Sequence, residues 1–329
     1  MSMEWACPSC HGTLEKETDN LRCISCNREY GVVAGIPDLR MAAPTWIDFD
    51  ADRERALLID ELVKSDGLAS AIVDVFVTSR GKTVEQAKYR CQQIFQGIEK
   101  NVSEIHNWLA PAFVSKDTIE IGCGGGQLLA AAASGGKVIA GLDASLEWLV
   151  IAKHLVRRSG GNPVLAAGLA EHLPIADGAM GGVISLDVLE HVVDQGAFVS
   201  EITRVMRTGG SFALATPNRF TLGLEPHVSV WGVGFLPVRL QKPWVKLISG
   251  KSYTYTRLLS VFETRNLFSK NGDLTLTVKF PPISNVDLSL FSPGKAMLAK
   301  LYNVLIRTTL VQSMAPFFGA FYRITGVKS

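Results

Sequence analysis

The pattern of apolar and polar residues predicts alternating strands and helices in the middle of the chain. Two short segments, Asp117–Ile121 and Val138–Leu142, have the length and pattern of buried strands. A glycine-dense turn follows the first run, and a helix is expected to begin near Gln127. Further strand patterns lie within residues 182–192 and 207–218. Alternation of this kind predicts an α/β domain built on a parallel sheet.

The region before this core, from Phe49 to about Val114, is charged and has helical spacing. Thr83 with Gln86 fits a capping box that opens the second of its helices. The region could be a lid over a binding site or a plain packing layer, and the pattern favours neither. Its apolar residues recur every three or four positions: Leu57, Leu58, Leu62 and Val63, then Ile94, Phe95, Ile98 and Val102.

Beyond residue 218 the expected pattern is interrupted by an aromatic and proline-rich segment, 220–251, which would build an acceptor pocket or cover. The sheet is expected to resume at Leu274–Val278, and a helix is expected over 295–311. We favour packing of that helix on the core, with a membrane-surface helix as the alternative. The apolar residues on or near one of its faces are Met297, Leu298, Leu301, Tyr302, Leu305 and Ile306.

Composition narrows the class of protein. A length of 329 residues suits about two domains, and 47% hydrophobic residues support buried cores. The longest uncharged apolar-rich run, 308–322, falls short of the roughly 18 residues that suggest a membrane span. No apolar h-region of a signal peptide opens the chain. We therefore expect a cytoplasmic protein.

The net charge of +2 hides an uneven distribution. Residues 221–329 hold 13 Lys and Arg against 4 Asp and Glu, an excess of +9, which leaves −7 for the first 220 residues. A basic, aromatic-rich C-terminal third suits an anionic partner such as a phosphate, a nucleic acid or a lipid headgroup. Peripheral contact with the inner face of a membrane is therefore part of the expectation.

Two Cys-x-x-Cys pairs near the N-terminus predict a metal site. Cys7 and Cys10 are separated by twelve residues from Cys23 and Cys26. Each pair brings two thiolates onto one tight turn, which suits tetrahedral Zn²⁺ in a structural role. Redox pairs or a disulfide framework are the alternative. The stretch through Gly35-Ile36-Pro37 resembles the small zinc-ribbon activator proteins of tRNA and rRNA methyltransferases.

The glycine-rich turn is the most informative segment. Glycines allow the backbone to approach a ligand closely, and the start of a helix adds a positive dipole end. An NAD-type G-x-G-x-x-G requires glycine where Gln127 stands, so that fingerprint fits badly. An acid, Asp143, closes the next strand 19 residues after Gly124, near the spacing of a ribose-binding carboxylate.

This set of residues resembles the class I S-adenosylmethionine-dependent methyltransferases of the small-molecule type, over about Val114 to Asn218. The E-x-G-x-G-x-G motif of that family is matched by Glu120, Gly122, Gly124 and Gly126. The resemblance implies a Rossmann-like sheet and S-adenosylmethionine as cofactor. Where the family often has Asp or Asn to bind adenine, this chain has Leu169. The implied cofactor-binding residues are Glu120, Gly122, Gly124, Gly126, Asp143, Ala144, Leu169, Ala170 and Asp187.

Two histidines stand where a general base could act on an acceptor. His191 follows the fourth strand, and His227 lies in the segment after the fifth. Asp187, Glu190 and His191 match positions that ubiquinone-biosynthesis O-methyltransferases associate with a divalent metal such as Mg²⁺. Packing and capping roles for these three residues are an equal alternative.

The leading hypothesis is therefore an S-adenosylmethionine-dependent methyltransferase that methylates oxygen on a small or lipid-linked, phosphate-bearing, glycan-type acceptor. An RNA methyltransferase is the second hypothesis, and a non-catalytic binding module is the third. The sequence does not determine the oligomeric state. The predicted division is a zinc ribbon (1–40), a helical connector or lid (41–113), a cofactor-binding core (114–218), and an acceptor-binding region with the remaining strands and a C-terminal helix (219–329).

Overall fold

The structure is a computed structural model, and contacts divide the chain into two compact units. The first holds residues 1–185, 200–212 and 328, and the second holds 186–199, 213–327 and 329. The predicted four-part division stays a prediction. The residues that the structure describes are 4–18, 20–41, 43–115, 117–270, 274–283, 288 and 293–329.

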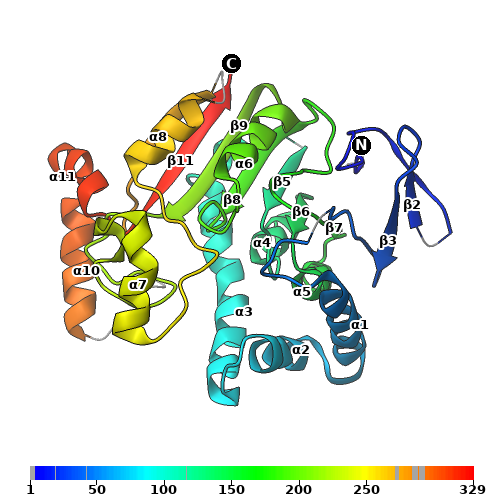
Figure 1. Cartoon of the computed structure of the whole chain (residues 1–329), viewed down its shortest axis with the longest axis horizontal. Helices are drawn as coiled ribbons and strands as arrows, with labels where there is room; N and C mark the ends of the chain where they lie inside the picture. Colours follow the sequence, from blue (N-terminus) through cyan, green and yellow to red (C-terminus); the bar gives the residue numbers. More distant parts are fainter. Residues whose placement is uncertain are drawn as a thin grey trace. The chain divides into compact units, whose positions relative to one another are not determined.

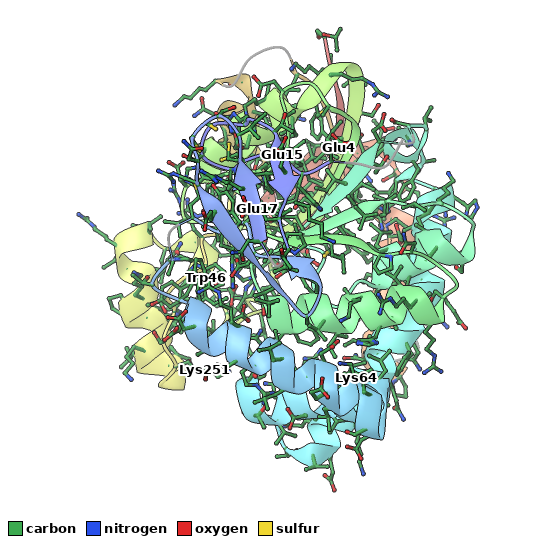
Figure 2. The ribbon with its side chains drawn as sticks, turned by 90° about the vertical axis from the view of Figure 1, so that its right-hand side faces the viewer. Glu4, Glu15, Glu17, Trp46, Lys64 and Lys251 are labelled. Carbon is green, nitrogen blue, oxygen red and sulfur yellow. The ribbon has the colours of Figure 1, made fainter. Side chains whose placement is uncertain are left out.

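A small antiparallel sheet forms the start of the first unit (Figure 1, blue). Within the described residues it has four strands in chain order, and Leu14 lies opposite Cys23. Its outer surface carries exposed acidic side chains, among them Glu15 and Glu17 (Figure 2). So small a sheet buries few apolar side chains, which leaves its stability dependent on another interaction. The strands are β1 (Leu14–Lys16), β2 (Asn20–Cys23), β3 (Glu29–Val33) and β4 (Ile36–Pro37).

Helices fill the predicted connector region. The side chain of Asp48 accepts hydrogen bonds from the first turn of α1, and Gly67, with a φ of 87°, ends it. The capping box of Thr83 and Gln86 opens α3, as the sequence predicts. The elements are α1 (Phe49–Asp66), α2 (Leu68–Asp74), a π-helical turn η1 (Val75–Ser79), α3 (Val84–His106) and a 3-10 turn η2 (Ala110–Phe113).

The buried face of α1 differs from the predicted apolar stripe. Leu57 and Leu58 are exposed, whereas Asp52 and Asp60 are buried. The buried face of α1 is formed by Asp52, Ala56, Ile59 and Asp60, and its two carboxylates make polar contacts with α5 (Leu146–Arg158). Asp60 binds the Lys153 ammonium and accepts a hydrogen bond from His154 at 2.8 Å. These carboxylates are buried with partners, so apolar spacing alone assigned the wrong face.

The central sheet confirms the predicted α/β class. Within the described residues it has seven strands in the order β10-β11-β9-β8-β5-β6-β7. β5 pairs in parallel with both β6 and β8, so that Ile119 lies opposite Ala140 and Val183. The carboxyl ends of these three strands therefore lie at one edge. The strands are β5 (Thr118–Ile121), β6 (Ala140–Asp143), β7 (Val164–Ala167), β8 (Met180–Leu186), β9 (Met206–Pro217), β10 (Leu274–Lys279) and β11 (Phe321–Lys328).

Helices connect the strands of this sheet as the strand-and-helix alternation predicts. α4 (Gln127–Ser134) begins at the residue expected from the glycine-rich turn and follows β5. α5 follows β6, and α6 (Gln195–Val205) lies in the chain between β8 and β9. β11 was not predicted, although it pairs with β9 and β10 in the sheet order. Its short alternating stretch at the end of the chain carried too little pattern to be recognised.

The second unit holds the helices that follow β9. α10 buries Ala299, and Ile306 just beyond its end is also buried, but Met297, Leu298, Leu301 and Leu305 are exposed, so fewer of the apolar residues pack than expected. Among the described residues, every helix is too short or too polar to traverse a lipid bilayer. The elements are η3 (Val233–Phe235), α7 (Val238–Ser249), α8 (Val261–Ser269), α10 (Pro293–Leu305), α11 (Thr309–Met314) and η4 (Ala315–Phe317).

Candidate functional site

The turn between β5 and α4 adopts a conformation that favours glycine. Gly122, Gly124 and Gly126 have φ angles of 75°, 48° and 77°. A Cβ on Gly126 would lie 2.7 Å from the Cβ of Ala152, so this glycine allows α5 to pack against the turn. Nothing lies within 4 Å of the position that a Cβ on Gly124 would occupy. The backbone at Gly124 therefore faces open space beside the start of a helix, where an incoming ligand can reach it.

Asp143 lies against this turn. Its Oδ2 accepts a hydrogen bond from the Gly124 N–H at 2.8 Å, and its Oδ1 accepts one from the Ser145 N–H at 2.9 Å. Burial raises the pKa of Asp143, while these two N–H groups oppose that change. Each carboxylate oxygen keeps a second lone pair. The side chain can therefore accept hydrogen bonds from the two hydroxyls of a ribose.

Glu120, near the end of β5, is a buried carboxyl group with an unused acceptor. The residue is 4% exposed, and among the described residues its Oε2 has no hydrogen-bond partner. Burial and the nearby Asp143 charge raise its pKa well above the usual value. A buried oxygen without a partner is costly unless a ligand supplies a donor. The open backbone at Gly124, the acceptors of Asp143 and this oxygen together suit a nucleoside that also carries donor groups.

The predicted adenine side lies beyond the end of β6 and β7. The Gly168 N–H donates to the Asp143 backbone carbonyl at 2.9 Å, which ties the loop after β7 to the end of β6. Leu169 is buried, and its carbonyl accepts a hydrogen bond from the His172 N–H. Ala170 is partly buried in the same turn. The structure thus brings Leu169 and Ala170 near the Asp143 loop through backbone contacts.

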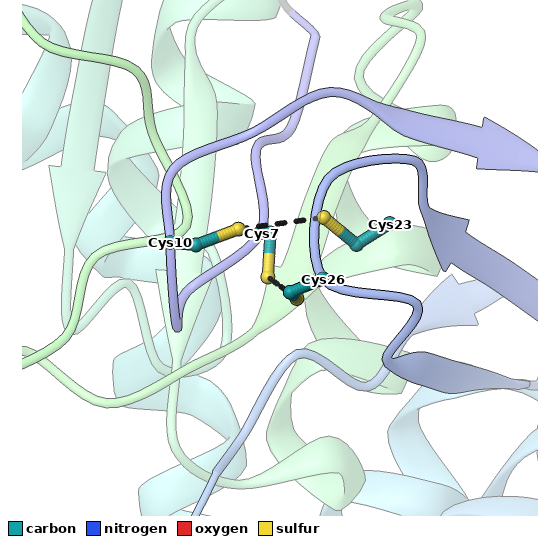
Figure 3. Close-up of side chains that lie close together, drawn as sticks. All are labelled: Cys7, Cys10, Cys23 and Cys26. Carbon is teal, nitrogen blue, oxygen red and sulfur yellow. Dashed lines mark hydrogen bonds between the residues drawn. The ribbon is translucent and has the colours of Figure 1, made fainter.

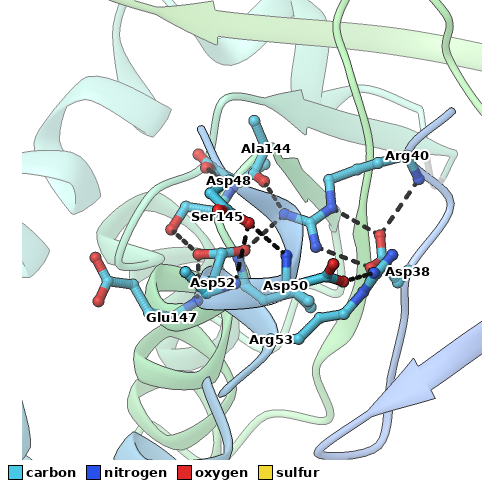
Figure 4. A network of polar contacts seen from close by, with 12 residues as sticks. Asp38, Arg40, Asp48, Asp50, Asp52, Arg53, Ala144, Ser145 and Glu147 are labelled. Carbon is cyan, nitrogen blue, oxygen red and sulfur yellow. Dashed lines mark hydrogen bonds and ion pairs between the residues drawn. The ribbon is translucent and has the colours of Figure 1, made fainter. Parts of the chain in front are cut away.

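A buried arginine supports that loop from the N-terminal part of the chain (Figure 4). The Arg40 guanidinium donates to both Asp38 carboxylate oxygens, at 2.7 and 2.8 Å, and to Asp52 at 2.6 Å. It also donates to the Ala144 carbonyl at 2.8 Å and lies 4.1 Å from the Phe49 ring centroid. Its side chain is fully buried. Two carboxylates, a carbonyl and an aromatic face compensate for the desolvation of this charge.

Asp52 joins the same network to the start of α5. Its carboxylate accepts hydrogen bonds from the Ser145 hydroxyl at 3.0 Å and from the Leu146 N–H at 2.8 Å. Ser145, the N-cap residue of α5, makes no capping bond of its own. Asp52 therefore caps this helix from a distant position in the chain. The three residues after Asp143 are therefore all held in place: Ala144 by Arg40, and Ser145 and Leu146 by Asp52.

The four N-terminal cysteines converge, as predicted (Figure 3). The sulfur atoms of Cys7 and Cys26 are 3.7 Å apart, those of Cys10 and Cys23 are 3.5 Å apart, and all four lie within 4.8 Å of one another. All four thiols are free. Tetrahedral Zn–S bonds of about 2.3 Å place sulfur atoms about 3.8 Å apart. The donor set and its spacing can therefore hold one tetrahedral ion.

A second cluster of titratable groups occupies the second unit. Nδ1 of His227 lies 2.6 Å from Oε1 of Glu225. The other oxygen of Glu225 accepts hydrogen bonds from the His227 and Val228 N–H groups. Partial burial lowers the pKa of His227, but Glu225 outweighs it and raises that pKa above 6.5. This geometry orients the ring and leaves Nε2 for a proton transfer.

Glu190 lies in the same cluster. It is 1% exposed, its Oε2 accepts from the Thr216 hydroxyl at 2.9 Å, and among the described residues its Oε1 has no partner. Burial, and then the charge of Asp187, raise the pKa of Glu190 to about 7. A carboxyl group with this pKa can exchange a proton near neutrality. Sequence reasoning placed it only in a metal or capping role.

The predicted triplet after β8 is only partly assembled. Glu190 and His191 bring ligand atoms within 4.8 Å of each other and of His227, but Asp187 is not in that group. The His191 and His227 rings make an edge-to-face contact with centroids 4.7 Å apart. Asp187 is exposed, with a φ of 56°, and its N–H donates to the Ala215 carbonyl. His227 therefore replaces Asp187 in the cluster that folding creates.

Sequence reasoning missed Asp38 and Arg40 at the end of the predicted ribbon and Asp52 in the predicted connector, because each looks like an ordinary charged surface residue. It also missed Glu225, although that residue precedes His227 by two positions. A carboxylate so close to a candidate base was a usable local signal. The Arg40 network had no such signal, since it joins residues about 100 positions apart.

Part of the chain is similar to known methyltransferases. Residues 119–214 match a family model described as a methyltransferase domain. A probable S-adenosylmethionine-dependent methyltransferase of Mycolicibacterium smegmatis is 36% identical over 117 residues, which are 36% of this chain and 44% of the relative. The ubiquinone biosynthesis O-methyltransferase of Brucella anthropi is 36% identical over 154 residues, which are 47% of this chain and 58% of the relative. The chain thus spans about half the length of each.

Among solved structures, phosphoethanolamine N-methyltransferase 2 of Haemonchus contortus, in complex with S-adenosylmethionine, is similar at 18% identity with a TM-score of 0.45. The match covers 70% of this chain and 52% of that one. The residues that match the methyltransferase-domain model, 119–214, extend from β5 into β9. The relatives named above use S-adenosylmethionine or methylate oxygen, according to their names.

We expect Arg40→Ala to lower the free energy of unfolding by about 3–5 kcal/mol, because the buried Asp52 loses its cation and the buried Asp38 keeps only the partly exposed Arg53. The matched control is Arg53→Ala. Arg53 binds the same Asp38 at 2.7 Å, but its side chain is 40% exposed, so the expected loss is about 1 kcal/mol or less. Urea unfolding of both variants measures the difference. Equal losses would contradict the role assigned to Arg40.

Proposed function

We propose that this chain is an S-adenosylmethionine-dependent O-methyltransferase. The observation that carries the proposal is the contact of the Asp143 carboxylate with the Gly124 N–H, 2.8 Å away, at the open glycine turn. When bound, S-adenosylmethionine would supply a methyl group on a sulfonium sulfur: an oxygen nucleophile attacks the methyl carbon, the C–S bond breaks, and S-adenosylhomocysteine leaves with the electron pair of that bond. Asp143 would hold the ribose hydroxyls, and Leu169 and Ala170 would border the adenine. The buried Glu120 oxygen would accept a donor from the same molecule.

Oxygen is the proposed acceptor atom because His227 could act as a general base and remove the proton of a hydroxyl group. Methyl transfer in line requires alignment first, and an alcohol or phenol also benefits from proton removal. His227 would remove that proton through Nε2, while Glu225 holds Nδ1 and stabilises the charged ring. Glu190, with a pKa of about 7, would share the proton. The similarity to a protein named as an O-methyltransferase supports this choice.

The proposed acceptor is small or lipid-linked and anionic, with a phosphate-bearing glycan as the leading class. An anionic acceptor is supported by the net charge of +9 in residues 221–329, which include His227 and α7. Cationic side chains near an acceptor site favour anionic groups. RNA would use the same charge, and it remains the second candidate for that reason.

Mg²⁺ fits the second cluster poorly. Glu190, His191 and His227 offer one carboxylate and two imidazoles, whereas Mg²⁺ prefers oxygen ligands. Nitrogen-rich donor sets suit transition metals better. We therefore assign no step of the reaction to Mg²⁺.

The proposed role of the N-terminal cysteines is structural Zn²⁺ binding. Four thiolates complete a tetrahedral shell and leave no open position for catalysis. The four short strands around them bury little apolar surface, so the ion would supply much of the stability of this ribbon. The ribbon ends in β4, just before Asp38 and Arg40. A folded ribbon would thus help to hold the buried arginine that supports the Ala144 carbonyl.

S-adenosylhomocysteine should bind the purified protein with a Kd in the micromolar range, measured by titration calorimetry. We expect Asp143→Ala to weaken this binding about ten- to hundredfold, because a charge-assisted acceptor of the ribose is lost. Asp66→Ala, which removes an exposed carboxylate at the end of α1, is the control and should leave the Kd unchanged. Absence of heat with the unaltered protein would reject the cofactor assignment.

His227→Asn should lower kcat by about 10²–10⁴-fold on hydroxylated acceptors with a labelled methyl donor, as loss of a general base does. Affinity for S-adenosylhomocysteine should not change.

In Glu225→Gln, the pKa of His227 should fall because its anionic partner is gone, so the acid limb of the pH profile of kcat should move to lower pH. A purely structural His227 would instead lower kcat and cofactor affinity together, with no shift of the limb.

The purified protein should contain about one equivalent of zinc per chain by elemental analysis. Cys23→Ser removes one of four ligands and should reduce the zinc content below half. Cys91→Ser is the matched control, because Cys91 is a buried thiol of α3 outside the cluster. A zinc content below half an equivalent in the unaltered protein would overturn the ribbon assignment.

A further inference from the structure

The segment from Trp231 to Lys251 presents apolar side chains to solvent. It comprises η3, α7 and the residues around them, and we call it the α7 surface (Figure 1, yellow). Leu247 is 77% exposed and Ile248 is 55% exposed. Soluble proteins seldom cluster large apolar side chains in this way without a partner. The exposed apolar side chains of the segment are Trp231, Phe235, Val238, Leu240, Leu247 and Ile248.

The opposite face of α7 is already packed. Gln241 and Val245 are buried, and Val245 belongs to an apolar cluster with Val228, Val233 and neighbouring residues. Trp244 packs on this cluster, and its Nε1 donates to the Trp231 carbonyl at 3.1 Å. The helix is therefore fixed on its own unit by one face. Its outward apolar residues are a separate surface, not a core that failed to close.

Exposed cations alternate with these apolar residues along the segment. Arg239, Lys242, Lys246 and Lys251 lie in the segment, and the sequence has no Asp or Glu between residues 231 and 257. Lys246 and Lys251 donate to backbone carbonyls, of Gly250 and Val228. Within the part of the chain that the structure describes, none of the four cations forms an ion pair. The positive charge of the α7 surface is therefore available to an anionic partner.

We propose that the α7 surface binds the face of an anionic lipid bilayer. Aromatic and aliphatic residues combined with Lys and Arg on one exposed helix are typical of helices that lie in the membrane interface. The apolar side chains would enter the headgroup boundary, while each cation gains from the negative surface potential. A second copy of the chain fits less well, since two such faces would bring eight cations together without acids. RNA would satisfy the cations but leave Leu247 and Ile248 in water.

A second helix of the same unit has a similar composition. α10 exposes Met297, Leu298, Leu301 and Val304, and Lys300 and Arg307 are exposed along it and just beyond its end. The sequence has no Asp or Glu after residue 287. Two exposed apolar and basic helices in one unit favour a broad lipid surface over a single small ligand.

Membrane contact at α7 would place the proposed acceptor site beside the bilayer. The apolar cluster that anchors α7 includes Val228, which directly follows His227. Glu225 holds both residues through their N–H groups. A lipid-linked acceptor could then reach His227 without leaving the bilayer surface. The membrane proposal itself does not depend on methyl transfer, and it can be tested with no acceptor present.

The test is sedimentation of the full-length protein with vesicles of phosphatidylcholine, alone or with about 30% phosphatidylglycerol. We expect at least tenfold tighter binding to the anionic vesicles. The pair Leu247→Ser/Ile248→Ser should reduce that binding at least tenfold. Arg239→Gln/Lys242→Gln should reduce it about 30-fold, because each cation near the surface contributes about 1 kcal/mol. Both pairs are exposed, so thermal unfolding should be nearly unchanged.

Val114→Ser and Lys16→Gln serve as matched controls, because both positions are exposed and lie in the first unit. They should bind anionic vesicles as the unaltered protein does. Three results would overturn the proposal. The first is no preference for anionic over neutral vesicles, or no binding to either. The second is equal binding by the paired variants, and the third is a dimer in light scattering that Leu247→Ser/Ile248→Ser converts to monomer.

Discussion

The hydrogen bond from the Gly124 N–H to the Asp143 carboxylate is the constraint around which the first unit is arranged. It joins the turn after β5 to the end of β6 at 2.8 Å, and three residues of that turn have positive φ angles, which favour glycine. α5 packs behind the turn because Gly126 has no side chain. Burial raises the pKa of Asp143, but the two N–H donors stabilise its charged form. The carboxylate can therefore still accept hydrogen bonds from a ligand.

The segment after Asp143 depends on a distant part of the chain. Ala144 and Ser145 are held by Arg40 and Asp52, which come from the end of the ribbon and from α1. A buried guanidinium with two carboxylates is costly to desolvate and permits few alternative arrangements. This explains why α1 turns acidic residues inward and leaves Leu57 and Leu58 exposed. In this fold the N-terminal elements shape the candidate cofactor site, although none of their side chains is proposed to touch the cofactor.

The second unit has two distinct features, a cluster of titratable groups and two exposed helices. In the cluster, Glu225 orients His227, and Glu190 has a buried oxygen without a partner among the described residues. The helices α7 and α10 expose apolar and cationic side chains. The apolar cluster around Val245 connects the two features, because it anchors α7 to the segment that follows His227. The proposed proton transfer and the proposed lipid contact thus depend on the same small apolar cluster.

The sequence by itself determined the α/β sheet, the glycine turn with Asp143, and the four cysteines, because these signals are local: short apolar runs, glycine at fixed spacing, and paired thiols. Similar local cues gave the capping box at Thr83 and the strand at residue 274. Only the tertiary structure decided that Arg40 supports Ala144, that His227 rather than Asp187 joins Glu190 and His191, and which residues of α10 face solvent. Each of these depends on groups far apart in the chain. The residues next to a charged or apolar residue in the sequence do not indicate which distant residue it will contact. Which side chains are buried, and which polar groups pair, is decided only when the helices and strands pack. Packing removes polar groups from water, and this is costly unless they find partners.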